Sequence, residues 1–166
     1  MENMINVSHH TVPLQLDYET FTSRLETQVL KSLEPNWSET LKANPASFEQ
    51  HINSLEGESG LMLFGIQAHG ALLSVIGQTR KAKQYIIGNP MTATRMTRHN
   101  IRAALYAPLR ILVYEENGKA FVEYDLPSTL FGQFCDKQIT AVGEELDKKL
   151  LKAIHLADGL QELGNQ

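Results

Sequence analysis

The sequence predicts a single α+β domain, and three observations support this fold class. The chain has 166 residues, which is within the ~100–200 residues that one domain usually holds. Apolar residues recur with helical spacing near both ends, whereas the middle contains short apolar runs typical of strands. The third observation is the pair Asn117-Gly118 between two alternating segments, which is the pattern of a tight β-hairpin. We therefore treat residues 1–166 as one domain.

Three amphipathic helices are predicted outside the middle of the chain. Asp17 and Asn44 suit the N-cap positions of helices over residues 17–31 and 45–56, the second with proline at its first position. A third helix is predicted over residues 137–156, with acids early and lysines later, as the helix dipole favours. Their apolar stripes are Phe21, Leu25 and Val29; Phe48, Ile52 and Leu55; and Ile139, Val142, Leu146, Leu150 and Ala153.

The middle of the chain alternates strands with helices. Residues 61–66 and 84–87 are short apolar runs beside turn residues, so we predict strands there. Between them a helix is expected over residues 69–78, and another begins at Asn89-Pro90. The apolar face expected for the helix over 69–78 is Leu72, Val75 and Ile76.

The hairpin has two distinct faces. A two-residue Asn117-Gly118 turn needs positive φ at both positions and fixes the register, with Arg110 opposite Asp125 as an expected ion pair. One face, expected in the core, carries Ile111, Val113, Val122 and Tyr124. The other carries Arg110, Leu112, Tyr114, Phe121, Glu123 and Asp125. Because this second face is more apolar than a solvated face, we expect a ligand, a partner chain or one of the protein's own helices to cover it.

The charges are distributed unevenly. Residues 59–114 contain no Asp or Glu and seven Lys or Arg residues, so this segment is +7. The whole chain is −4, which leaves −11 for the remainder. Either acidic helices from elsewhere neutralise this segment, or it contains a site for an anionic ligand.

Composition favours a cytoplasmic protein. Cys135 is the only cysteine, so no disulfide can form within the chain, and we interpret it as a small buried hydrophobic residue. The first ten residues do not resemble a signal peptide, and no stretch is long and apolar enough to span a membrane. The negative net charge argues against nucleic acid as a partner.

Several short motifs in residues 60–134 resemble domain-of-unknown-function family 302. They are Gly60-Leu61-Met62-Leu63-Phe64 with Ile66 and His69, Ile87-Gly88-Asn89-Pro90, Ala107-Pro108-Leu109-Arg110-Ile111-Leu112-Val113-Tyr114-Glu115, and Tyr124-Asp125-Leu126-Pro127. The resemblance implies a bacterial protein with a two-layer sandwich, in which helices pack on one curved, mainly antiparallel sheet, and which is often dimeric. It implies no reaction and does not account for residues 1–56. The family usually has Ile-Asp-His where this chain has Ile66-Gln67-Ala68-His69, so a His–Asp partnership lacks local support.

His69 is the candidate catalytic residue. It follows a strand at the start of a helix, where a histidine can act as general acid or base, with Tyr85, Tyr106 or Arg110 as polar helpers. The alternative is a hydrogen-bonded histidine that caps the helix. The six histidines show no metal-ligand spacing, and His9-His10 is interpreted as part of a tail. We therefore predict no metal and no cofactor.

Asn89 is the second candidate, because a helix N-terminus with Arg95 and Arg98 nearby can bind an anion. The alternative is a plain helix cap, and Met91 and Met96 either fill the core or line an apolar pocket. The complete set of predicted ligand-binding residues is Asn89, Arg95, Arg98, Tyr106, Arg110, Tyr124 and Asp125.

Three functions remain open at this point. We favour a homodimeric protein that binds a small amphipathic or anionic molecule. The alternatives are a cofactor-free enzyme that uses His69 and a purely structural partner protein.

Overall fold

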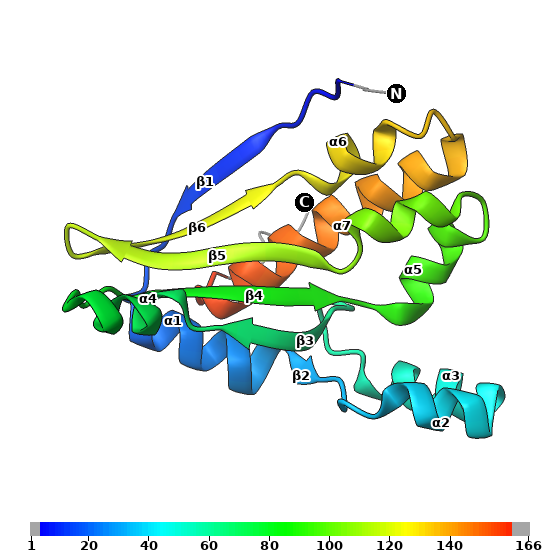
Figure 1. The fold of residues 1–166 in the computed structure, drawn as a ribbon, viewed down its shortest axis with the longest axis horizontal. Coiled ribbons are helices and arrows are strands. Elements are labelled where there is room, and N and C mark those ends of the chain that lie inside the picture. The colour runs from blue at the N-terminus through cyan, green and yellow to red at the C-terminus, as the bar shows by residue number, and fades with distance from the viewer. Residues whose placement is uncertain (1–3, 161–166) are drawn as a thin grey trace.

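A six-stranded open sheet forms the centre of the computed structural model, which describes residues 4–160 (Figure 1). The strands lie in the order β1-β6-β5-β4-β3-β2, and every neighbouring pair is antiparallel except β2 and β3. Their bounds are β1 His9–Pro13, β2 Lys31–Ser32, β3 Met62–Gln67, β4 Ala82–Gly88, β5 Leu109–Glu116 and β6 Lys119–Asp125. The predicted α+β class and mainly antiparallel sheet are confirmed.

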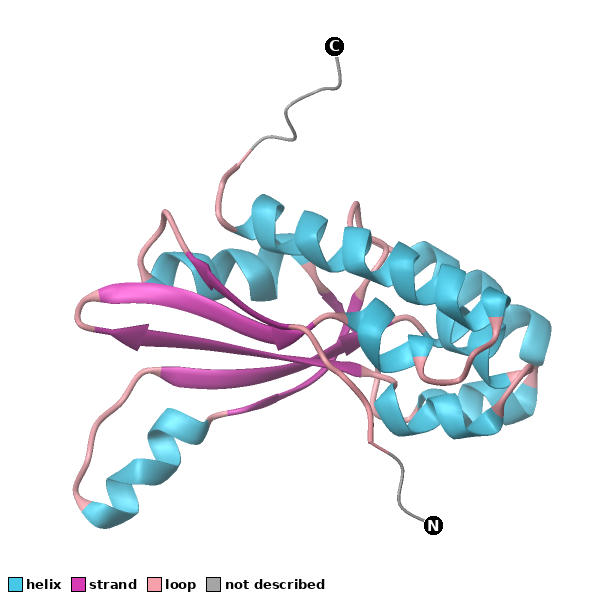
Figure 2. Ribbon diagram, turned by 90° about the horizontal axis from the view of Figure 1, so that it is seen from above, coloured by secondary structure: helices cyan, strands magenta, loops and turns pink. Residues whose placement is uncertain are grey.

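Most of the helices occupy three places around this sheet. A long helix, α7, runs behind it with α1 and a π-helical turn, η1, on the same side (Figure 2). At one end of the sheet α5, η3 and α6 cluster against α7, and α2 and α3 form a separate pair at the β2–β3 corner. The bounds are α1 Tyr18–Arg24, η1 Leu25–Val29, α2 Trp37–Ala43, α3 Pro45–Leu55, α4 His69–Leu72, η2 Leu73–Ile76, α5 Pro90–Thr97, η3 Ile101–Tyr106, α6 Pro127–Gly132 and α7 Lys137–Ala157.

The helix starts that the sequence predicts are confirmed by their capping geometry. The Asp17 carboxylate accepts from the Thr20 N–H, and the Asn44 side chain accepts from the Ser47 N–H. The Asp136 carboxylate accepts from the N–H groups of Gln138 and Ile139 at the start of α7. Each cap satisfies donors that a helix N-terminus otherwise leaves free.

The predicted hairpin register is also confirmed. Asn117 and Gly118 both have positive φ, and Glu116 pairs with Lys119. The inner face is buried against α1 and α7, and its members belong to the main core. The outward-facing side chains of Leu112, Tyr114 and Phe121 are half-buried and belong to neither core cluster.

A second core cluster lies under α2 and α3. Phe48 and Ile52 from α3 pack with Leu33 and with Met62 of β3, all four buried. Trp37 and Phe64 pack against this cluster from its edge. The helix pair is therefore attached to the sheet by its own small hydrophobic core, separate from the main one.

Three sequence-based expectations are wrong. Residues 69–78 do not form one packed helix: α4 is followed by the 3₁₀ turn η2, and Leu72, Val75 and Ile76 are exposed. Cys135 is exposed and not buried. His9 and His10 lie in strand β1 and not in a tail, because residues preceding the first predicted helix pair with β6.

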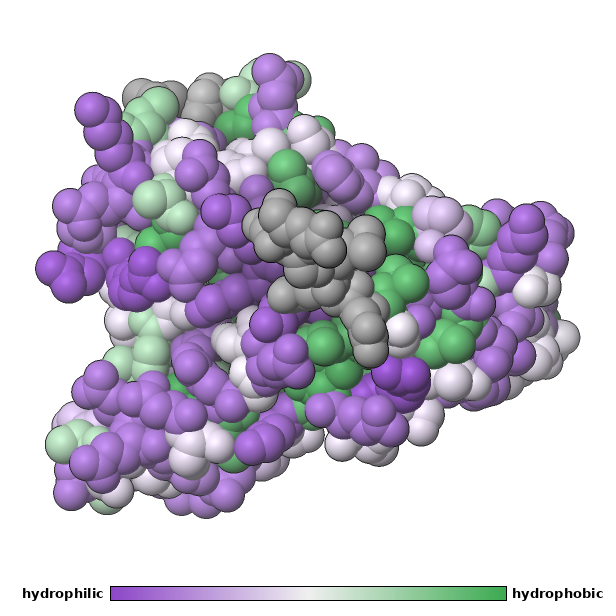
Figure 3. All heavy atoms as spheres, turned by 180° about the vertical axis from the view of Figure 1, so that it is seen from behind, coloured by the Kyte–Doolittle hydropathy of each residue, from purple (hydrophilic) through white to green (hydrophobic). Residues whose placement is uncertain are grey.

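The side of the molecule that carries α7 is mainly hydrophilic, with smaller hydrophobic areas between the polar side chains (Figure 3). Within residues 4–160, no helix is long and apolar enough to cross a membrane.

Candidate ligand-binding site

An apolar cavity of about 530 Å³ lies where α2 and α3 face α5 and the adjoining ends of β4 and β5. This volume is within the range of small-molecule sites, ~300–1,000 Å³. Its walls combine residues from across the described chain: Trp37, Leu41, Pro45, Phe48, Glu49, Phe64, Gly88, Asn89, Pro90, Met91, Thr92, Ala93, Thr94, Met96, Thr97, Ala104, Ala107, Pro108, Leu109, Phe131 and Leu146.

Few polar groups of this cavity are available to a ligand. The Thr94 and Thr97 hydroxyls donate to carbonyl oxygens of their own helix, at 2.7 and 3.1 Å. Glu49 is exposed, and no ion pair involves it among the described residues. The cavity therefore suits a molecule with an apolar body, and Glu49 supplies a negative charge among the lining residues.

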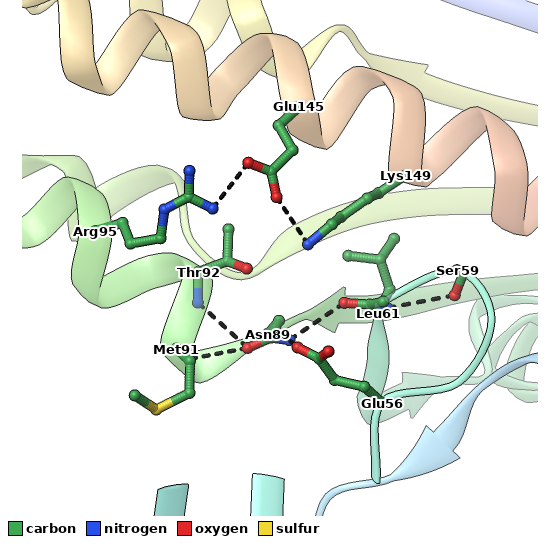
Figure 4. A network of polar contacts seen from close by, with 10 residues as sticks. Glu56, Ser59, Leu61, Asn89, Met91, Thr92, Arg95, Glu145 and Lys149 are labelled. Carbon is green, nitrogen blue, oxygen red and sulfur yellow. Dashed lines mark hydrogen bonds and ion pairs between the residues drawn. The ribbon is translucent and has the colours of Figure 1, made fainter. Parts of the chain in front are cut away.

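Asn89 is buried and forms the centre of a hydrogen-bond network (Figure 4). Its side-chain oxygen accepts from the N–H groups of Met91 and Thr92, at 2.8 and 3.2 Å. Its amide nitrogen donates to the Glu56 carboxylate and to the Gly60 carbonyl. The two bonds of the oxygen cap α5, as the plain helix-cap interpretation of Asn89 expects. The two bonds of the amide nitrogen tie the start of α5 to the loop between α3 and β3, so both side-chain polar groups are already occupied.

A second polar link joins α5 to α7 (Figure 4). The Glu145 carboxylate lies 2.8 Å from the Arg95 guanidinium and 2.9 Å from the Lys149 ammonium. Burial alone would raise the pKa of Glu145, but the hydrogen bonds from Lys149 and Arg95 outweigh burial and lower it. Arg95 is thus held by an acid from outside the segment 59–114.

The same neutralisation occurs at two other cations of that segment. Lys81 pairs with Glu19 and Glu115, and Lys83 pairs with Glu26 at 2.8 Å. Glu26 also accepts from the buried Tyr85 hydroxyl, and burial with this bond raises the pKa of Tyr85 far above its ordinary value. The acidic residues of other elements therefore neutralise part of the +7 segment.

His69 lies exposed at the start of α4 and lines neither this cavity nor a second cavity formed by α5 and α7. Of its expected helpers, Tyr85 is bonded to Glu26, and the Tyr106 ring packs edge-on against Phe131 and Phe134. His69 is therefore not part of either cavity.

Arg110, Tyr124 and Asp125 do not converge on one site. Arg110 is exposed, whereas Tyr124 is buried and stacks on His10 at a ring distance of 5.4 Å. The expected ion pair between Arg110 and Asp125 is not formed, because the ladder of β5 with β6 ends one pair earlier. Asp125 instead pairs with His9, Nδ1 to Oδ1 at 2.9 Å, because β1 is the other neighbour of β6.

The seven predicted ligand residues therefore occupy different parts of the molecule. Asn89 alone lines the apolar cavity, Arg95 and Arg98 line the second cavity, and Tyr106 lies against α6. Met91 and Met96 both line the apolar cavity, and both also pack in the cores, Met96 in the main cluster and Met91 against the second cluster. Within residues 4–160, no group of three or more His, Cys, Asp or Glu side chains could hold a metal ion.

The fold resembles a solved protein. The crystal structure of the uncharacterized conserved protein DUF302 from Bacillus stearothermophilus matches with a TM-score of 0.64 at 19% sequence identity. The match covers 90% of this chain and 97% of that chain, so it shows a shared fold. No curated protein matches this sequence.

The model of the family called domain of unknown function DUF302 matches residues 37–157. This range is wider than the motifs in residues 60–134, since it also contains α2, α3 and α7. The helix pair that forms one wall of the apolar cavity therefore belongs to the family domain and is not an addition to it. The chain belongs to the DUF302 family, whose function is not established.

Proposed function

We propose that this protein binds a small amphipathic molecule, whose apolar body occupies the cavity between α2–α3 and α5. The observation that carries the proposal is the cavity itself, about 530 Å³ with walls that are almost entirely apolar. Water in such a space makes few hydrogen bonds, so an apolar group that replaces it is favoured. The helix pair rests on its own small core, so it can adjust to a ligand while the main core is unchanged.

We also propose that the protein is a homodimer that associates through the outer face of the hairpin. Leu112, Tyr114 and Phe121 lie on this face outside both core clusters. Of the covers expected for this face, a ligand and a second copy of the chain therefore remain. Such a group of neighbouring apolar side chains is typical of an association surface. The single exposed thiol of Cys135 suits a reducing compartment, and we therefore propose a cytoplasmic location.

Native mass spectrometry of freshly purified full-length protein tests both proposals. We expect a dimer mass together with a retained low-molecular-weight species that organic extraction removes. A monomer with no retained species would leave the dimer unsupported and would require direct titration of the cavity.

The chain offers an internal reporter for that titration, because its one tryptophan, Trp37, lines the cavity. We expect fatty alcohols and fatty acids of increasing chain length to change Trp37 fluorescence saturably, the alcohols more tightly because Glu49 lines the cavity. Absence of any saturable change across the series would contradict the proposal.

Filling the cavity gives the sharpest control. Ala93→Phe places a large side chain among the lining residues and should weaken binding at least tenfold. Ala104→Phe, on the η3 side, is a second such variant should the first fail to fold. Ala71→Phe adds the same ring to the exposed α4, outside the cavity, and should bind like the parent. Equal binding by all variants would place the ligand elsewhere.

A further inference from the structure

A second cavity, of about 400 Å³, lies between the end of α5 and the first turns of α7. It shares no lining residue with the apolar cavity. Its lining includes Arg95, Arg98, His99, Lys137 and Gln138, with Val142 as a buried apolar contact and no acidic residue. Two arginines and a lysine thus line one concave space.

The positive charge at this cavity is only partly neutralised. Arg95 pairs with Glu145, but no ion pair or hydrogen bond of the Arg98 or Lys137 side chain occurs within residues 4–160. Arg98 belongs to the acid-free segment 59–114, where other cations are held by carboxylates. Two cationic side chains at one cavity therefore remain available to an anion.

The start of α7 adds little to this charge. The Asp136 carboxylate already accepts from the N–H groups of Gln138 and Ile139, at 2.7 and 3.1 Å, so these donors are not available. Asp136 also brings a negative charge next to Lys137. A ligand would therefore be held by the side chains of α5 and α7 and not by the helix terminus.

We propose that this second cavity binds the phosphate group of a small phosphate monoester. The Arg98 guanidinium presents a planar set of donors that matches two phosphate oxygens, and Lys137 adds a compact positive charge. Arg95 is kept in place by Glu145 and lines the same space. The volume exceeds the need of a phosphate ion, and Val142 offers an apolar contact to the organic part.

Calorimetric titration of the full-length protein with inorganic phosphate and with phenyl phosphate, at constant ionic strength, tests this site. We expect saturable binding of both, tighter for phenyl phosphate. The double variant Arg98→Gln/Lys137→Gln should weaken both at least tenfold. The double variant Arg80→Gln/Lys148→Gln also removes one charge from the acid-free segment and one from α7, at exposed positions outside the cavity, and should bind like the parent.

Three results would overturn the proposal. They are no saturable heat with either probe, equal weakening by both double variants, and tighter binding of a single-stranded oligonucleotide than of phenyl phosphate. All four replaced residues are exposed, and circular dichroism checks that each variant is folded. Because the apolar cavity has other walls, binding of fatty alcohols should be unchanged in both double variants, which keeps the two proposals separable.

Discussion

The two faces of the β5–β6 hairpin carry similar numbers of apolar side chains but are held in different ways. On the inner face Ile111, Val113 and Val122 are almost fully buried in the main core, to which α1 and α7 also contribute. On the outer face the Tyr114 and Phe121 rings stack on each other, with centroids 5.5 Å apart. The inner face is thus fixed by burial and the outer face by contacts within itself. Alternation along a strand identifies the residues that share a face, but not what the face meets.

Polar contacts support the outer face. The Tyr114 hydroxyl donates to Glu123 at 2.6 Å, and this bond together with burial raises the pKa of Tyr114 to about 12. Glu123 also lies 3.5 Å from His9 Nε2, next to the pair of His9 with Asp125. These contacts are solvent-accessible, so their strength should depend on pH and salt.

Substitutions at two adjacent residues of β5, one on each face, should show the largest difference in stability between the inner and outer faces. Ile111→Ala should reduce the free energy of unfolding by about 2–5 kcal/mol, because it leaves a cavity in the main core. Leu112→Ala should cost about 1 kcal/mol or less in the monomer, since its side chain is only half-buried. Urea unfolding at low protein concentration measures both. Similar losses for the two variants at low protein concentration would show that the outer face is already covered within the monomer.

The next test asks whether a second copy covers the outer face. Phe121→Glu places a charge in the stacked pair and should convert the expected dimer to a monomer in sedimentation experiments. Leu151→Glu, at an exposed position of α7 on the other side of the sheet, should stay dimeric. A parent protein that is monomeric at high micromolar concentration would refute the dimer directly.

The smallest expected effect concerns His9. Its hydrogen bond with Asp125, followed by the charge of that carboxylate and the contact with Glu123, raises its pKa above the ordinary 6.5. Folding therefore favours the protonated ring, so its stabilisation is fully present below about pH 6.5 and is lost as the pH rises through the raised pKa. The protection of the β1 amides against hydrogen exchange, corrected for the intrinsic rise of exchange with pH, should fall over that rise. His9→Gln should remove this pH dependence, and an unchanged profile in the variant would assign it to another group.

The sequence predicted those parts of the fold that depend on neighbouring residues. Asp17, Asn44 and Asn89 each form the predicted cap, because a cap involves only the next three residues. The turn at Asn117-Gly118 fixes its own register in the same way. The predicted helix over 69–78 was wrong because a packed helix also needs a surface that only distant residues supply. Apolar spacing alone does not provide this surface, and Leu72, Val75 and Ile76 remain exposed.

The candidate sites were less predictable because they are assembled from distant segments. The apolar cavity combines residues between Trp37 and Leu146, and no local pattern connects α2 with α7. Met91 and Met96 were the only signal of an apolar pocket in the sequence. For the second cavity, the acid-free segment indicated Arg95 and Arg98. Lys137 comes from another element, α7, which folding brings beside them. The pair of His9 with Asp125 was missed because β1 was interpreted as a tail.

The two outermost strands have a consequence for how copies of this protein can aggregate. An exposed strand edge is a template on which another chain can add, and long flat edges favour fibre growth. Here one edge strand, β2, has only two residues, and the other, β1, ends at Pro13, which has no N–H to donate. Lateral extension of the sheet into fibres is therefore disfavoured in the folded protein.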